Sequence, residues 1–168
     1  MHQQKTFNLA GLQTSCIVVP NAILRHKVNR AINTDEVAEP NSFAITASIT
    51  AFEKGGKWLE ELKSYIESNK QMAHAYIKTY LPELHVTPSE ATYLLWIDCS
   101  HVCKNSLELV EFIRSTTGLY LSSGEEYGKN AKSFIRMNIA CPQERLNDGL
   151  KRLRQGIGNY KKGSEINE

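Results

Sequence analysis

One long amphipathic stretch constrains the fold of this chain more than any other feature. From Lys57 to about Leu81, apolar residues recur with the spacing of a helix, and Gly55-Gly56 separates this stretch from the sequence before it. The apolar positions are Leu59, Leu62, Ile66, Ala73, Tyr76 and Ile77. A helix of about 25 residues is about 37 Å long, because each residue adds 1.5 Å. The stretch is therefore long enough to join two lobes of a molecule.

The sequence after this helix alternates between strand and helix patterns. The expected strands are 85–87, 93–98, 119–122 and 133–140, and the expected helices cover 105–117 and the residues from 142 onward. Asn105 is placed to cap the first of these helices and Gly118 to end it. In the last helix the residues expected to point inward are Leu146, Leu150, Leu153 and Ile157. Short strands alternating with covering helices predict an α/β fold, more narrowly an α+β sandwich.

The first 56 residues carry different signals. A run rich in β-branched residues over 13–20 predicts a short strand that ends at Pro20, and Asn21 is placed to cap a helix after it. Asn41 or Ser42 is placed to cap another helix, which ends at the glycine pair. This part therefore predicts one strand and two helices.

Composition and charge argue against several classes of protein. Hydrophobic residues make up 41% of the 168 residues and charged residues 23%, which are globular values. The net charge of +2 gives no case for binding nucleic acid or an anionic membrane, and no apolar run approaches the ~20 residues that span a bilayer. The four cysteines form no paired framework, which favours reduced thiols in a cytoplasmic protein. Cys99, His101 and Cys103 lack the second pair of ligands typical of a zinc site, so we expect no metal.

Lys5 and Arg136 are the two candidates for chemistry. Lys5 is followed by mostly apolar residues, and apolar surroundings lower the pKa of a lysine so that its amine can condense with an aldehyde. Alternatively, Lys5 is a solvated charge. Arg136 lies inside an apolar strand, where its charge requires a partner or a ligand, and its guanidinium matches a carboxylate with two parallel hydrogen bonds. The alternatives are a structural ion pair or a position at the sheet edge in water.

Four segments carry a resemblance to a known family, and they occur in the family's order. They are K-T-F-N-L-A-G-L from Lys5, P-N-S-F-A from Pro40, T-Y-L-L-W-I-D from Thr92 and F-I-R-M-N-I-A-C-P from Phe134. Together they resemble the pyridoxal phosphate (PLP) enzymes of fold type I, the class I and II aminotransferases, and within them the carbon–sulfur lyases of the cystathionine β-lyase kind. The resemblance covers nearly the whole chain.

The resemblance implies a function for each candidate residue. Lys5 would bind the cofactor PLP and take the Cα proton of the substrate, and Arg136 would bind the α-carboxylate of an amino-acid substrate. Asn41 would lie near the substrate in the active site of a neighbouring subunit, which implies a homodimer. The chain would be the C-terminal part of such an enzyme. Residues 1–56 would be the end of the large PLP-binding domain with its last strand and helix, 57–82 a linking helix and 83–168 the small C-terminal domain.

The reaction stays open between three alternatives. A lyase would convert cystathionine to a thiol, pyruvate and ammonia, whereas an aminotransferase would exchange amino groups between amino acids and keto acids. Gln13 stands where many aminotransferases have a phosphate-binding arginine, which favours the lyase. The family's acidic partner for the pyridine nitrogen and its ring-stacking aromatic residue precede the lysine. We therefore expect this chain alone to be inactive. The third alternative is a folded dimerisation or binding module without catalysis.

Overall fold

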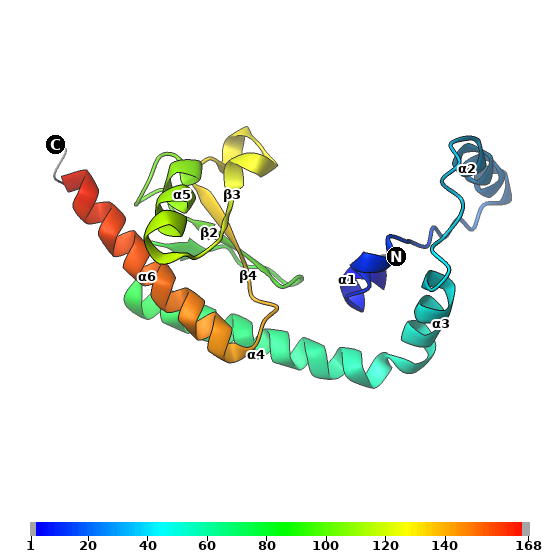
Figure 1. Ribbon diagram of the computed structural model, residues 1–168, viewed down its shortest axis with the longest axis horizontal. Coiled ribbons are helices and arrows are strands. Elements are labelled where there is room, and N and C mark those ends of the chain that lie inside the picture. Colours follow the sequence, from blue (N-terminus) through cyan, green and yellow to red (C-terminus); the bar gives the residue numbers. More distant parts are fainter. Residues whose placement is uncertain (1–2, 166–168) are drawn as a thin grey trace. The chain divides into compact units, whose positions relative to one another are not determined.

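The computed structural model describes residues 3–165, with side chains for residues 5–163. It divides into two compact units, Met1–Lys63 and Ser64–Glu168, and the boundary falls inside the long helix α4 (Gly56–Tyr80) (Figure 1). This helix matches the predicted one closely.

The first unit is helical. It contains the short turns α1 (Gln3–Thr6) and η1 (Ala10–Leu12), the helices α2 (Ala22–Thr34) and α3 (Ala44–Lys54), and the first turns of α4. Asn21 caps α2 as predicted, because its side chain accepts a hydrogen bond of 3.0 Å from the Leu24 backbone N–H. The strand predicted over 13–20 is wrong: these residues have no regular secondary structure. A strand needs a neighbour for its hydrogen bonds, and within its described residues this unit has none.

Apolar side chains of the first unit remain largely exposed. Among its described residues, Ala44 at the start of α3 is the one buried apolar residue. Phe7 packs edge-on against Phe52 at 5.6 Å between ring centroids and stacks on Trp58 at 6.2 Å. The large exposed apolar residues of this unit are Ile17, Val18, Ile23, Leu24, Val37, Phe43, Ile45, Ile49, Phe52 and Trp58.

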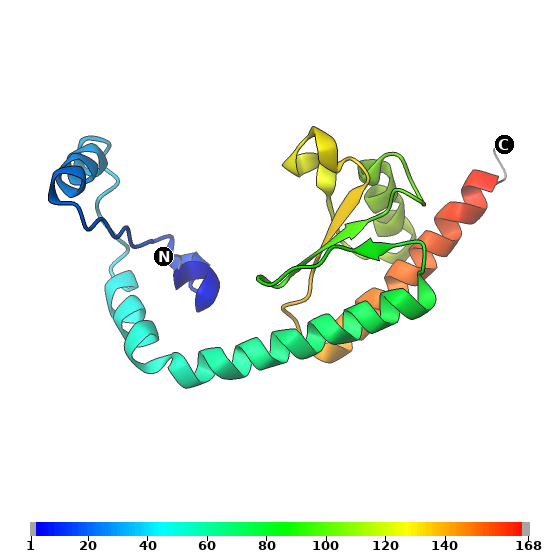
Figure 2. The same cartoon turned by 180° about the vertical axis from the view of Figure 1, so that it is seen from behind.

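The second unit is built on a four-stranded antiparallel sheet in the order β1-β2-β4-β3. The strands are β1 (His85–Val86), β2 (Leu94–Asp98), β3 (Ser122–Ser123) and β4 (Phe134–Asn138), and the helices are α5 (Ser106–Thr117) and α6 (Gln143–Glu165). The single-turn helices η2 (Gly124–Tyr127) and η3 (Lys129–Ala131) connect β3 to β4. In Figure 2 they lie beside β3 and β4, away from α4. The expected mixture of helices and a small sheet is confirmed.

One continuous core holds the second unit together. Strand residues on one face of the sheet are buried together with one side of α4, α5 and α6. The fully buried large side chains are Ile77, Leu95, Ile97, Leu109, Ile113, Ile135, Ile139, Leu146, Leu150, Leu153 and Ile157. At about 25 cal/mol per Å² of apolar area, burial of this many large side chains is the main stabilising contribution.

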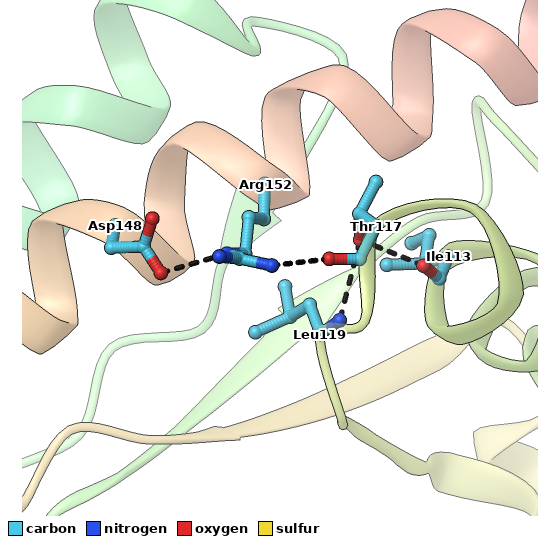
Figure 3. A network of polar contacts seen from close by, with 5 residues as sticks. All are labelled: Ile113, Thr117, Leu119, Asp148 and Arg152. Atoms are coloured by element: carbon cyan, nitrogen blue, oxygen red, sulfur yellow. Dashed lines mark hydrogen bonds and ion pairs between the residues drawn. The ribbon is translucent and has the colours of Figure 1, made fainter.

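Polar contacts attach α6 to the end of α5. Arg152 donates one hydrogen bond to the Asp148 carboxylate at 2.7 Å and another to the Thr117 carbonyl oxygen at 2.6 Å (Figure 3). The Thr117 hydroxyl donates to the Ile113 carbonyl at 2.7 Å and accepts from the Leu119 N–H at 3.3 Å. The carbonyl groups of the last helical turn have no partners within their own helix. Arg152 thus supplies the partner that the last carbonyl of α5 lacks.

Candidate functional site

Arg136 lies on the face of the sheet opposite to the core. In β4 the buried residues Ile135 and Met137 point toward the helices, so the alternation of a strand places Arg136 on the other face. Pairing with β2 sets Trp96 directly opposite Arg136, and pairing with β3 sets Ser122 on its other side. We call this side of the sheet, with Trp96, Ser122, Phe134 and Arg136, the open face.

The guanidinium of Arg136 is half-buried and is held by neutral groups. It donates a hydrogen bond of 3.2 Å from Nη2 to the hydroxyl of Ser122, and its central carbon lies 4.6 Å from the ring centroid of Tyr127. Among the residues whose side chains the structure describes, no carboxylate lies within ion-pair distance of it. The structural ion pair weighed from the sequence is therefore not formed within this part of the chain. The guanidinium keeps unused donors for a carboxylate.

A cluster of the aromatic rings Trp96, Phe134 and Tyr127 lies on the open face, with Tyr127 against the Arg136 guanidinium. The Trp96 ring stacks on Phe134 at 5.5 Å with an interplanar angle of 12°, and Tyr127 meets Trp96 edge-on at 5.7 Å. The sequence does not predict this aromatic cluster, because Trp96 follows the alternation of a core strand and Tyr127 lies in a polar loop. The strand pairing brings Trp96 and Arg136 together, and the turn of η2 brings in Tyr127. The arginine within the strand pattern was the one signal of this site in the sequence.

Lys5 lies in the other unit, in the short helix α1, with an exposed side chain. Its amine forms no hydrogen bond or ion pair with any of residues 5–163. Asn8, three residues later, has a positive φ of 54° and lies in a turn just before η1 (Ala10–Leu12). Within the described residues Lys5 is thus exposed, as in the alternative of a solvated charge, and the apolar surroundings expected from the sequence do not enclose it. Its primary amine is accessible and lies close to this turn.

Asn41 lies in the exposed loop before α3. Its Oδ1 accepts a hydrogen bond of 2.9 Å from the Phe43 N–H, and its carbonyl accepts one of 2.8 Å from the Ala44 N–H. The side chain thus forms an Asx turn just before the helix. The predicted cap at Asn41 or Ser42 is wrong, because the cap position of α3 is Phe43, whose side chain makes no capping hydrogen bond. Its role in binding substrate stays a prediction.

A cleft of about 690 Å³ also lies within the first unit. It is lined by residues of the 13–17 segment, α2, the 37–40 loop and α3. Neither Lys5 nor Asn41 is among its lining residues. The cleft therefore adds no residue to the predicted site.

The buried thiols of the second unit are poor nucleophiles. Burial raises the pKa of Cys99 far above its usual value and raises the pKa of Cys103 to about 11. Both remain protonated at neutral pH, and a thiol reacts and binds metals as the thiolate. The described part of the chain contains no group of three or more His, Cys, Asp or Glu side chains that could hold a metal ion.

Comparisons with known proteins give consistent results. Residues 5–153 match the family described as aminotransferase class I and II. Cystathionine beta-lyase PatB of Bacillus subtilis (strain 168) is 37% identical over 153 residues, which are 91% of this chain and 40% of PatB. Protein MalY of Escherichia coli (strain K12) is 27% identical over 147 residues, which are 87% of this chain and 38% of MalY.

A solved structure agrees with these relatives. The PLP-bound C-S lyase of Staphylococcus hominis, captured with L-cycloserine, has a TM-score of 0.82 at 32% identity, and the match covers 94% of this chain and 38% of that one. This chain therefore spans about 40% of the length of the relatives it matches. In the part of the chain that the structure describes, no helix is both long and apolar enough to cross a membrane.

Proposed function

The chain belongs to the aminotransferase class I and II family, and from this premise we propose that it forms one part of a PLP-dependent carbon–sulfur lyase. The substrate is a sulfur amino acid such as cystathionine. Cleavage of its Cβ–S bond with addition of one water molecule releases a thiol, pyruvate and ammonia. The identity of 37% to a cystathionine beta-lyase supports this reaction.

The observation that carries the proposal is the half-buried guanidinium of Arg136 without an acidic partner among the described residues. An arginine in this state binds the α-carboxylate of an amino acid with two parallel hydrogen bonds. The bound carboxylate then fixes the orientation of Cα and of the Cβ–S bond.

The residues present fit two of the functions that a PLP site needs. Lys5 offers an accessible primary amine, the group that condenses with the aldehyde of PLP, and Arg136 offers an anchor for the substrate. PLP, when bound, supplies an electron sink that stabilises negative charge at Cα. Lys5 Nζ accepts the proton that leaves Cα, and it can return a proton in a later step. Arg136 keeps the carboxylate in place during both transfers.

The proposal also assigns domain roles, a homodimer and a cellular compartment. We assign residues 1–56 to the end of a PLP-binding domain, 57–82 to a linking helix and 83–168 to a small substrate-binding domain. We assign Asn41 to the substrate site of a partner subunit, as the family resemblance implies. Its Oδ1 is engaged in the turn, and its Nδ2 group makes no hydrogen bond within the described residues and can therefore donate to a ligand. Since no disulfide joins the four cysteines, a reducing compartment such as the cytoplasm suits the chain.

Self-association through residues 6–52 is the expected consequence of the exposed apolar surface of the first unit. Analytical ultracentrifugation of the chain should show dimers or larger species at micromolar concentration. Replacing Ile23 and Leu24 by glutamate should shift the distribution toward the monomer, because both side chains are more than half exposed on α2. A strictly monomeric profile of the unsubstituted chain would contradict the prediction.

The cofactor lysine is tested by titration with PLP, reduction with borohydride and peptide mapping. In an enzyme that contains this chain in full, the expected result is specific labelling of Lys5 that is lost in Lys5→Arg while the labelling of other lysines stays the same. Labelling spread over surface lysines would leave the alternative of a folded module without catalysis.

An aminotransferase is the second candidate, because the matched family is named for that reaction. An enzyme that contains this chain in full should release pyruvate from cystathionine without any keto acid. A requirement for a keto acid would favour the aminotransferase.

A further inference from the structure

We infer that Tyr127 is a positioning residue that holds the Arg136 guanidinium ready for the substrate carboxylate. The inference rests on the proposed function and concerns the same site. It is carried by the η2 turn, which places the ring of Tyr127 over the guanidinium of Arg136.

The geometry of the pair is the first step. The central carbon of the Arg136 guanidinium lies 4.6 Å from the centroid of the Tyr127 ring, within the range of a cation–π interaction. The ring attracts the positive charge through its π electrons. It lacks the two oxygens in one plane with which a carboxylate engages the donor fork of the guanidinium. Tyr127 therefore stabilises the cation without occupying the donors that a substrate needs.

The remaining contacts of the guanidinium lead to the same conclusion. An aspartate or glutamate at the position of Tyr127 would form an ion pair and compete with the substrate carboxylate. Instead, the described partners of Arg136 are one ring and one hydroxyl, the 3.2 Å hydrogen bond to Ser122. Together they limit the rotation of a flexible side chain, and this lowers the entropy lost on binding.

The turn that carries Tyr127 is itself tightly determined. The hydroxyl of Ser123 is buried, lies 2.8 Å from that of Ser106 and accepts a hydrogen bond of 3.2 Å from the Glu125 N–H. The next residue must be glycine, because a Cβ atom at Gly124 would clash with two carbonyl oxygens. One belongs to Ala131, and the other belongs to Phe134 and would lie 2.6 Å from the Cβ. These contacts fix the start of η2 against β4. They leave little freedom in where the ring of Tyr127 lies.

The end of the turn is constrained as well. Gly128 has a φ of 138°, which residues with a side chain rarely adopt, so the chain turns away immediately after the tyrosine. Meanwhile Tyr127 packs edge-on against Trp96 at 5.7 Å, and this contact orients the ring from its other side. About half of the Tyr127 side chain remains exposed, so its role in the core is small.

The test uses the whole chain labelled with ¹⁵N and follows the Nε–Hε signal of Arg136, assigned with Arg136→Lys. Its heteronuclear NOE reports the order of the guanidinium, and a titration with propionate reports its affinity for a carboxylate. Tyr127→Phe keeps the ring and Tyr127→Leu removes it. Tyr120→Leu is the matched control, because Tyr120 forms a similar pair with Arg114 at 5.2 Å on an exposed surface.

The expected result is specific to the ring of Tyr127. Tyr127→Leu should lower the NOE of Arg136 and weaken the binding of propionate by about three- to tenfold, whereas Tyr127→Phe and Tyr120→Leu should keep both values within about twofold. If propionate binds the unsubstituted chain, but Tyr127→Leu leaves both the NOE of Arg136 and the affinity for propionate unchanged, the inference is overturned and the proposed function is not. No response of Arg136 to propionate in the unsubstituted chain would overturn the proposed function, and the inference with it.

Discussion

The two units of the chain use apolar residues in opposite ways. The second unit buries its large aliphatic side chains in one core between a sheet and three helices. The first unit also forms amphipathic helices, but among its described residues Ala44 is the one buried apolar residue. On α2, Ile23 is 71% exposed and Leu24 is 54% exposed. The comparison teaches that helix signals alone do not produce a core. The second unit should be stable by itself, and the first unit needs a further surface to cover its apolar residues.

The largest expected effect tests this comparison directly. Leu150→Ala removes a fully buried side chain from α6 and should lower the free energy of unfolding by about 2–5 kcal/mol, because it leaves a cavity. Leu24→Ala, on the exposed side of α2, should change it by about 0.5 kcal/mol or less. Urea unfolding followed by circular dichroism, at a protein concentration low enough to keep the chain monomeric, measures both. Equal losses for the two variants would break the comparison.

A second test uses the pH dependence of stability. Burial raises the pKa of Cys103 from 9.0 to about 11, so the folded state keeps a proton that the unfolded state loses above pH 9. The resulting stabilisation is fully present below pH 9 and is lost as the pH rises toward 11, by about 2 kcal/mol for a shift of this size. The free energy of unfolding, measured between pH 8 and 11 for the unsubstituted chain and for Cys103→Ala, gives the part of the alkaline loss that depends on this thiol.

The control for this test is Cys16→Ala in the first unit, since Cys16 is exposed. It should leave the alkaline loss of stability as it is in the unsubstituted chain, whereas Cys103→Ala should reduce it. A loss of the same size in all three proteins would contradict the role of the buried thiol.

The smallest expected effect compares two arginines that bind backbone carbonyls. Arg152 donates to the Thr117 carbonyl at 2.6 Å in the second unit, and Arg25 donates to the Val19 carbonyl at 3.0 Å in the first. Arg152→Ala should lower the free energy of unfolding by about 1 kcal/mol, because the carbonyl at a partly buried helix end loses its partner. Arg25→Ala, in an exposed setting, should cost less than about 0.5 kcal/mol. Thermal unfolding by calorimetry resolves the two, and a larger loss for Arg25→Ala would reverse the interpretation.

The sequence by itself determined the features that depend on neighbours along the chain. The spacing of apolar residues predicted α4 and the inward face of α6, and the structure confirms Leu146, Leu150, Leu153 and Ile157 as buried. Local hydrogen bonding explains why the caps were predictable. Asn105 accepts from the Leu107 N–H, and Gly118 ends α5 with a left-handed φ of 73°. The resemblance in the sequence likewise predicted the family.

The tertiary structure decided the features that depend on residues far apart in the chain. Residues 13–20 have the composition of a strand, yet a strand forms only where another strand offers hydrogen bonds. In the same way, Arg136 was recognisable as a charge in an apolar strand, but Ser122, Trp96 and Tyr127 became its neighbours through the pairing of β2, β3 and β4 and the turn of η2. Which strands pair with each other depends on packing between segments far apart in the chain, and the spacing of residues within one strand does not show it.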